Sequence, residues 1–117
     1  MKLREIAASL EFRHLTPELD DRLDVDVTSG HSSDLLSDVL SNAPSGGVIV
    51  TIQAHMNVVA VALHAHSAAV ILAAGRSADP EVVERATEEK IVVFSTGLST
   101  FDVVGRLYAL GLRGTRT

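Results

Sequence analysis

Cysteine and tryptophan are absent from the 117-residue sequence, and only three phenylalanines and one tyrosine supply aromatic rings. Without cysteine the chain can form no disulfide, no thiolate nucleophile and no cysteine zinc site, and this composition fits a cytosolic protein. Because aromatic residues are so few, alanine, valine, leucine and isoleucine must fill the interior. Such small aliphatic side chains suit helices that pack closely on a parallel sheet.

Basic charge and long apolar runs are also scarce. Ten lysines and arginines face fifteen aspartates and glutamates, which gives a formal net charge of −5. A protein that follows nucleic-acid phosphates needs a basic face, so we expect no nucleic-acid binding. The mostly apolar stretch 58–74 is interrupted by His64, His66 and Ser67, and each part is shorter than the roughly 20 residues of a spanning helix. We therefore expect no membrane segment and a cytoplasmic location.

The length of the chain suits one domain with one core. Apolar residues make up 46% of it, which is enough to bury a core, and the charged content of 21% is typical of globular proteins. We expect one domain over residues 1–112 and a frayed C-terminal tail over 113–117.

Strand and helix patterns alternate in the second half of the chain. Apolar runs predict buried strands at 48–52, 69–73 and 91–94, and helical patterns predict helices at 58–66, 80–90 and 101–110. Alternating elements with short connections imply right-handed crossovers and a parallel sheet. We therefore predict an α/β domain of three layers, with a mainly parallel sheet and helices on both faces.

The first half is less regular. Apolar spacing predicts helices over 3–10 and 33–42, a short strand over 11–15 and an exposed strand over 24–28. The acidic stretch between Glu18 and Asp26 predicts a turn, because it lacks the glycine and the terminal glutamate of a calcium loop. Asp34 and Asp38 are four residues apart and could resemble a paired-carboxylate site, but we expect them on the solvent side of the helix.

Polar residues follow the predicted strands, where ligands collect in parallel sheets. The candidate ligand-binding residues are His31, Gln53, His55, Asn57, Gly75, Arg76 and Thr96. Helices beginning at Ser33, Asn57 and Ser99 would aim free backbone amides at this edge. Arg76 would add a forked positive charge suited to phosphate or carboxylate. We predict a small anionic ligand here, such as a nucleotide; the alternative is that these residues only cap helices and form turns.

Catalytic motifs are missing. Gly46–Gly47 lacks the Gly-Lys-Ser/Thr ending of a phosphate-binding loop, and 95–99 lacks a Gly-x-Ser-x-Gly elbow. His64 and His66 point to nearly opposite sides of a predicted helix and cannot clamp one metal. We therefore predict no metal, no cofactor and no catalytic residue. A small enzyme with His31 or His55 as general acid or base is the alternative.

Several short motifs occur in an order that is typical of one family. They are Ser-Asp-Leu-Leu-Ser-Asp-Val at 33–39, Thr-Ile-Gln-Ala-His-Met-Asn at 51–57, Gly-Arg at 75–76, Asp-Pro-Glu at 79–81, and the segment 99–107. Together they resemble a stand-alone DRTGG domain over residues 3–112. The resemblance implies a fold like the N-terminal domain of HPr kinase/phosphorylase, and an accessory role in regulation and dimerisation. It implies no kinase activity, because the ATP-binding loop belongs to another domain.

The namesake motif of that family is altered here. Its Asp-Arg falls at Ala54–His55 and its Thr-Gly-Gly at Ala73–Ala74–Gly75, so only the last glycine is kept. The predicted helix over 58–65 has no polar residue except His64, so a neighbouring element or a second subunit must cover it. We therefore predict a homodimeric regulatory module that binds a small anionic ligand or a partner protein.

Overall fold

A five-stranded sheet forms the centre of the computed structural model, which describes residues 1–114. The strands are β1 (Arg13–His14), β2 (Gly30–Ser32), β3 (Val48–Thr51), β4 (Ala69–Leu72) and β5 (Val92–Ser95), in the spatial order β1-β5-β4-β3-β2. Strands β2 to β5 are parallel, and β1 pairs antiparallel with β5. The predicted mainly parallel sheet is confirmed, including the pairing of β3 with β4.

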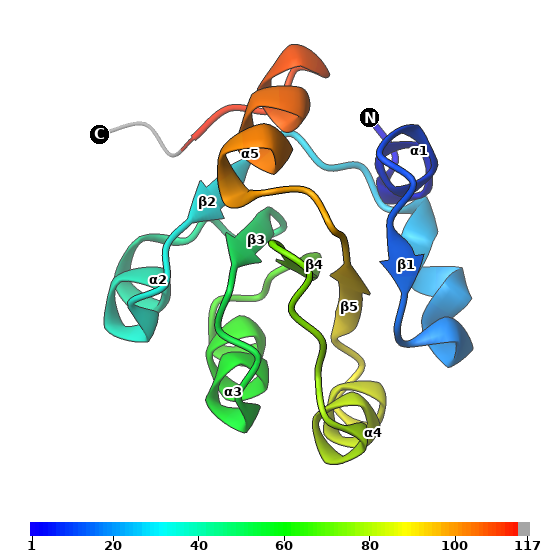
Figure 1. Ribbon diagram of the computed structural model, residues 1–117, viewed down its shortest axis with the longest axis vertical. Coiled ribbons are helices and arrows are strands. Elements are labelled where there is room, and N and C mark those ends of the chain that lie inside the picture. Colours follow the sequence, from blue (N-terminus) through cyan, green and yellow to red (C-terminus); the bar gives the residue numbers. More distant parts are fainter. Residues whose placement is uncertain (115–117) are drawn as a thin grey trace.

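Helices cover both faces of this sheet, as predicted (Figure 1). One face carries α1 (Leu3–Ser9), the 3₁₀ helix η1 (Pro17–Asp24) and α5 (Thr100–Ala109), and the other carries α2 (Leu36–Asn42), α3 (Met56–His64) and α4 (Pro80–Glu88). Alternating strand residues supply the two cores: Val48 and Val50 face α1 and α5, whereas Ile49 faces α2 to α4. Because both faces are buried, β3 and β4 are apolar almost throughout.

The predicted exposed strand over 24–28 is wrong. The acidic stretch forms η1, and the Arg4 guanidinium holds it by donating to Asp20 and Asp24 at 3.1 and 3.0 Å. The strand comes later, at Gly30–Ser32, where the backbone pairs with β3. His31 therefore lies inside a strand instead of in the loop that follows one.

The last described residues run beside the outer edge of β2. The Arg113 amide donates to the Thr28 carbonyl at 3.1 Å, and the Gly30 amide donates to the Arg113 carbonyl at 3.0 Å. Leu112 is buried in the core. Arg113, which the sequence placed in a frayed tail, is thus paired with the sheet, and residues 115–117 of that predicted tail lie outside the described residues.

Helix α3 lies between α2 and α4 (Figure 1). Val58, Val59 and Ala62 are buried, whereas Leu63 is 43% exposed. The helix ends at His64, two residues before the predicted end. Its neighbours supply part of the cover that its apolar sequence requires, and the second subunit stays a prediction. None of the helices within residues 1–114 is long and apolar enough to cross a membrane.

Candidate functional site

The parallel strands end at one edge of the sheet, here called the carboxyl edge. Six of the seven predicted ligand-binding residues follow β3, β4 or β5 at this edge: Gln53, His55, Asn57, Gly75, Arg76 and Thr96. His31 is the exception, because it sits in the middle of β2. The candidate site is therefore built from three loops of adjacent strands.

The loop after β3 is organised by a residue that the sequence analysis placed elsewhere. A carboxylate oxygen of Asp34 accepts hydrogen bonds from the Thr51 hydroxyl at 2.9 Å and from the Ile52 amide at 2.8 Å. The Gln53 side-chain amide donates to the Asp34 carbonyl at 3.1 Å. Asp34 does not solvate a helix, because α2 begins only at Leu36. It ties the end of β2 to the end of β3, and the predicted role is wrong.

His55 is the N-cap of α3, a role that the sequence assigned to Asn57. Helix α3 begins at Met56, and the His55 Nδ1 atom accepts the Asn57 amide hydrogen at 3.2 Å. Neutral His55 then carries its proton on Nε2, because Nδ1 acts as the acceptor. Both residues are exposed. The His55 ring is therefore hydrogen-bonded to the Asn57 backbone amide, which the sequence analysis expected to face the ligand.

The loops after β4 and β5 meet through their backbones. The Gly75 amide donates to the Thr96 carbonyl at 2.9 Å. Gly75 has a φ of +71°, in the left-handed region that favours glycine, so the surviving glycine of the altered motif makes this turn. The Thr96 hydroxyl accepts the Leu98 amide hydrogen at 3.2 Å. The Arg76 side chain is exposed, and its guanidinium forms no hydrogen bond or ion pair within residues 1–114.

His31 lies apart from these loops and pairs with α2. Its Nε2 atom is 2.8 Å from a carboxylate oxygen of Asp38, whose other oxygen accepts the Asn42 side-chain amide at 2.7 Å. These hydrogen bonds, the one from His31 foremost, lower the pKa of Asp38. Asp38, which was expected on the solvent side of the helix, is partly exposed on α2 and also pairs with His31. A carboxylate that orients a histidine suits a general base, yet no hydroxyl within residues 1–114 is bonded to His31.

The structure thus shows which predicted donors are already occupied. The Ser99 hydroxyl accepts the Asp102 amide hydrogen, so Ser99 caps α5 as predicted. His55 fills the same role for α3. The described residues hold no group of three side chains placed to bind a metal ion. Among the candidate residues, Arg76 offers the fixed positive charge that remains open to an anion.

Comparison with known proteins identifies relatives of the whole fold. The model of the DRTGG domain family matches residues 8–110. No curated protein sequence matches the chain. One similar solved structure is the crystal structure of the CBS and DRTGG domains of the regulatory region of Clostridium perfringens pyrophosphatase, complexed with the activator diadenosine tetraphosphate. It aligns with a TM-score of 0.71 and 17% identity, over 95% of this chain and 47% of that chain. This chain therefore spans about half of that regulatory region, and the likeness shows a shared fold.

Proposed function

The chain belongs to the DRTGG domain family, and from this premise we propose that it is a non-catalytic regulatory module that senses a small anionic ligand. The observation that carries the proposal is the fold shared, over 95% of this chain, with a regulatory region crystallised with its activator. That activator is a dinucleotide with four phosphates. A nucleotide is accordingly the ligand class that we propose for this chain.

We place the anionic part of the ligand at the carboxyl edge, against Arg76. The arginine is exposed and unpaired within residues 1–114, and the turn at Gly75 fixes its backbone against the loop after β5. A guanidinium presents a planar fork of donors that matches a phosphate. The exposed His55 ring stands in the neighbouring loop. Gln53, Asn57 and Thr96 complete the polar surroundings.

Calorimetric titration with diadenosine tetraphosphate and with ATP tests this site. We expect saturable binding to the wild type and an affinity at least tenfold weaker in the double variant Arg76→Ala, His55→Ala. Arg106→Ala is the matched control, because Arg106 is an exposed arginine on α5. Its affinity should equal that of the wild type. Equal affinities of the double variant and the control would overturn the proposed site.

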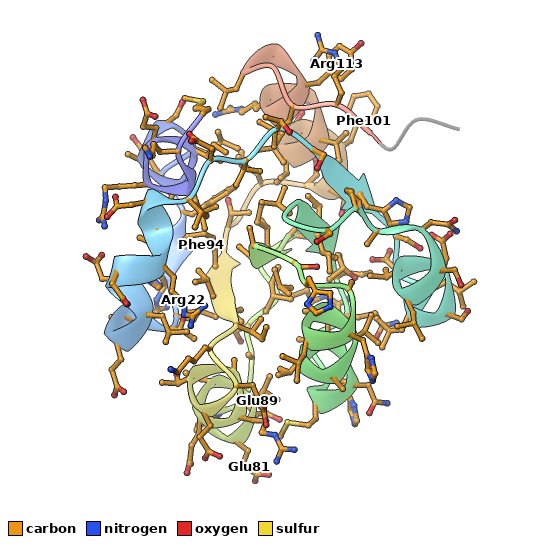
Figure 2. The ribbon with its side chains drawn as sticks, turned by 180° about the vertical axis from the view of Figure 1, so that it is seen from behind. Arg22, Glu81, Glu89, Phe94, Phe101 and Arg113 are labelled. Carbon is orange, nitrogen blue, oxygen red and sulfur yellow. The ribbon has the colours of Figure 1, made fainter. Side chains whose placement is uncertain are left out.

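We also propose that the module acts as a homodimer. Support comes from Phe101, whose ring is 86% exposed and projects from α5 (Figure 2). The apolar helix α3 also leaves Leu63 43% exposed, and apolar side chains left to solvent in this way can mark an interaction surface. Sedimentation equilibrium at tens of micromolar protein should give twice the chain mass of 12.4 kDa. A species of 12.4 kDa in that experiment would contradict the dimer.

A further inference from the structure

A pocket of about 260 Å³ lies between β2 and α5, away from the loops around Arg76. The apolar side chains that line it are Val50, Val104, Leu107 and Leu112, and the exposed side chains of Tyr108 and Arg113 border it. Ligand sites commonly measure about 300–1,000 Å³, so this pocket suits a single ring system instead of a whole dinucleotide. Its apolar walls would desolvate a flat ring.

Two backbone groups of β2 that have no backbone partner within residues 1–114 border the same pocket. In a parallel strand, successive residues direct their backbone groups to opposite sides. The Ser33 amide donates inward to β3, whereas the Gly30 amide donates outward to the Arg113 carbonyl. By this alternation, the Gly30 carbonyl and the Ser32 amide also face outward. Neither has a backbone partner within residues 1–114, because β2 is the last strand of the sheet and the Arg113 bridge ends at Gly30.

The rim adds an aromatic surface and a positive charge. The Arg113 guanidinium stacks on the Tyr108 ring, 3.7 Å from the ring centre. The Arg113 Nη1 atom also donates to the carbonyls of Tyr108 and Leu112, at 2.9 and 2.8 Å. These bonds hold the arginine and the tyrosine together beside the strand edge. A planar ligand ring with a nearby negative group could stack on this aromatic surface and pair with the positive charge of Arg113 at the same place.

We propose that this pocket binds an adenine base through the edge of β2. Adenine carries an amino donor next to a ring-nitrogen acceptor. The outward Gly30 carbonyl and Ser32 amide offer the complementary acceptor and donor on one strand. The apolar walls would enclose the ring. The site does not depend on Arg76, because none of its lining residues belongs to the loops after β3, β4 or β5.

Titration of the full chain with adenosine, which has no phosphate, tests the proposal by calorimetry and by amide chemical shifts. We expect saturable binding with shifts at Gly30 and Ser32. Ser32→Pro removes the amide donor and should weaken binding at least tenfold, and proline is tolerated on an edge strand where the N–H faces outward. Ser32→Ala keeps the amide and should bind like the wild type. Purine riboside, which lacks the amino group, should bind at least tenfold more weakly than adenosine.

Val104→Trp provides a second route, because it fills the pocket from a partly exposed helix position if Ser32→Pro does not fold. It should abolish adenosine binding. Three results would each overturn the inference: no adenosine binding to the wild type at millimolar concentration, unchanged binding to Val104→Trp, or equal binding of purine riboside. The double variant Arg76→Ala, His55→Ala should keep its adenosine affinity. Loss of adenosine there would place the base at the carboxyl edge and would also overturn the pocket.

Discussion

The two edges of the sheet are finished in different ways. Just beyond the end of β1, Thr16 is fully buried and its hydroxyl accepts the Val93 amide hydrogen at 3.1 Å, so a β5 donor that β1 is too short to pair is satisfied inside the protein. At the β2 edge, the outer backbone groups of Gly30 and Ser32 border a pocket, and the nearby Tyr108 is 58% exposed. We call the β1 side the closed edge and the β2 side the open edge, because the outer Ser32 amide of β2 has no backbone partner within residues 1–114.

Under the proposed binding role of the open edge, this difference would separate stability from function along one sheet. A sheet edge is a template for further pairing unless it is covered. The closed edge uses buried aromatic and polar contacts, and breaking them should destabilise the whole fold. The open edge uses exposed side chains, and changing them should affect binding with little effect on unfolding. The predictions below test this contrast from the largest effect to the smallest.

Phe94→Ala should be the most destabilising change. Phe94 is 1% exposed on β5 (Figure 2). Its ring centre lies 5.6 Å from that of Phe12 and 5.2 Å from that of His14. Removing such a ring leaves a cavity and costs about 3–5 kcal/mol of unfolding free energy. Leu35→Ala is the control, because Leu35 follows β2 at the other edge and is 65% exposed, and it should change stability by less than about 0.5 kcal/mol. Equal urea midpoints for the two variants would remove the contrast.

Thr16→Val should cost about 1–3 kcal/mol, because it keeps the shape of the side chain and leaves the buried Val93 amide without an acceptor. Hydrogen exchange at Val93 should become faster in this variant. The control is Thr28→Val, since Thr28 is exposed beside the other edge. If Thr16→Val is as stable as the control, the hydroxyl does not close the β1 edge.

Asp34→Ala should destabilise the carboxyl end of β2 and β3 by about 1–2 kcal/mol. The substitution removes the acceptor of the buried Thr51 hydroxyl and of the Ile52 amide. Asp21→Ala, an exposed aspartate in η1, removes the same charge without such bonds and should be nearly neutral. Chemical unfolding of both variants measures the difference. A neutral Asp34→Ala would mean that water replaces these bonds at no cost.

Low pH should weaken the closed edge through His14. Burial lowers the pKa of this histidine. Its Nδ1 atom accepts the Thr16 amide hydrogen at 3.2 Å, and its buried Nε2 has no partner within residues 1–114. Because the folded pKa lies below the ordinary value of about 6.5, the stability that His14 contributes is present above that value and is lost as the pH falls below it.

The free energy of unfolding of the wild type should therefore fall more between pH 7.5 and 5.5 than that of His14→Leu. Protonation places a hydrogen on Nδ1, which can then no longer accept from Thr16. Parallel pH profiles for the two proteins would show that the edge tolerates a charged His14.

The sequence predicted the strands whose own residues favour a strand conformation. The runs at 48–52, 69–73 and 91–94 are β-branched or apolar, and they became β3, β4 and β5. It failed at β2, because Gly-His-Ser carries no strand pattern and becomes a strand only by pairing with β3. The stretch 24–28 alternates like a strand, but its pairing is limited to a single antiparallel bridge between Asp26 and Lys2 and to one hydrogen bond from Arg113. Pairing with β3, and not the local sequence pattern, therefore determined that Gly30–Ser32 forms the strand.

For the candidate site too, the sequence predicted the positions of the residues but not their hydrogen-bond partners. Chain position alone placed Arg76 and the loop residues at the carboxyl edge. The partners of Gln53 and His31 were not predictable, because Asp34 and Asp38 meet them only through the packing of α2 against the sheet. His55 as a helix cap was missed because histidine is not among the favoured capping residues. The pocket beside β2 was missed because Arg113 pairs with a strand more than eighty positions earlier in the chain.

Tyr108→Ala should have the smallest effect on stability. Its ring is 58% exposed and its contact with Arg113 is a cation–π interaction at the surface, worth about 0.5–1 kcal/mol. If the β2 edge serves binding, the same change should weaken adenosine affinity about tenfold, since stacking of a base on an aromatic ring contributes about 1–3 kcal/mol. Tyr108→Phe keeps the ring and should preserve both properties. A large loss of stability in Tyr108→Ala, with adenosine affinity unchanged, would show that this edge is closed by structure like the β1 edge, and the contrast between the two edges would fail.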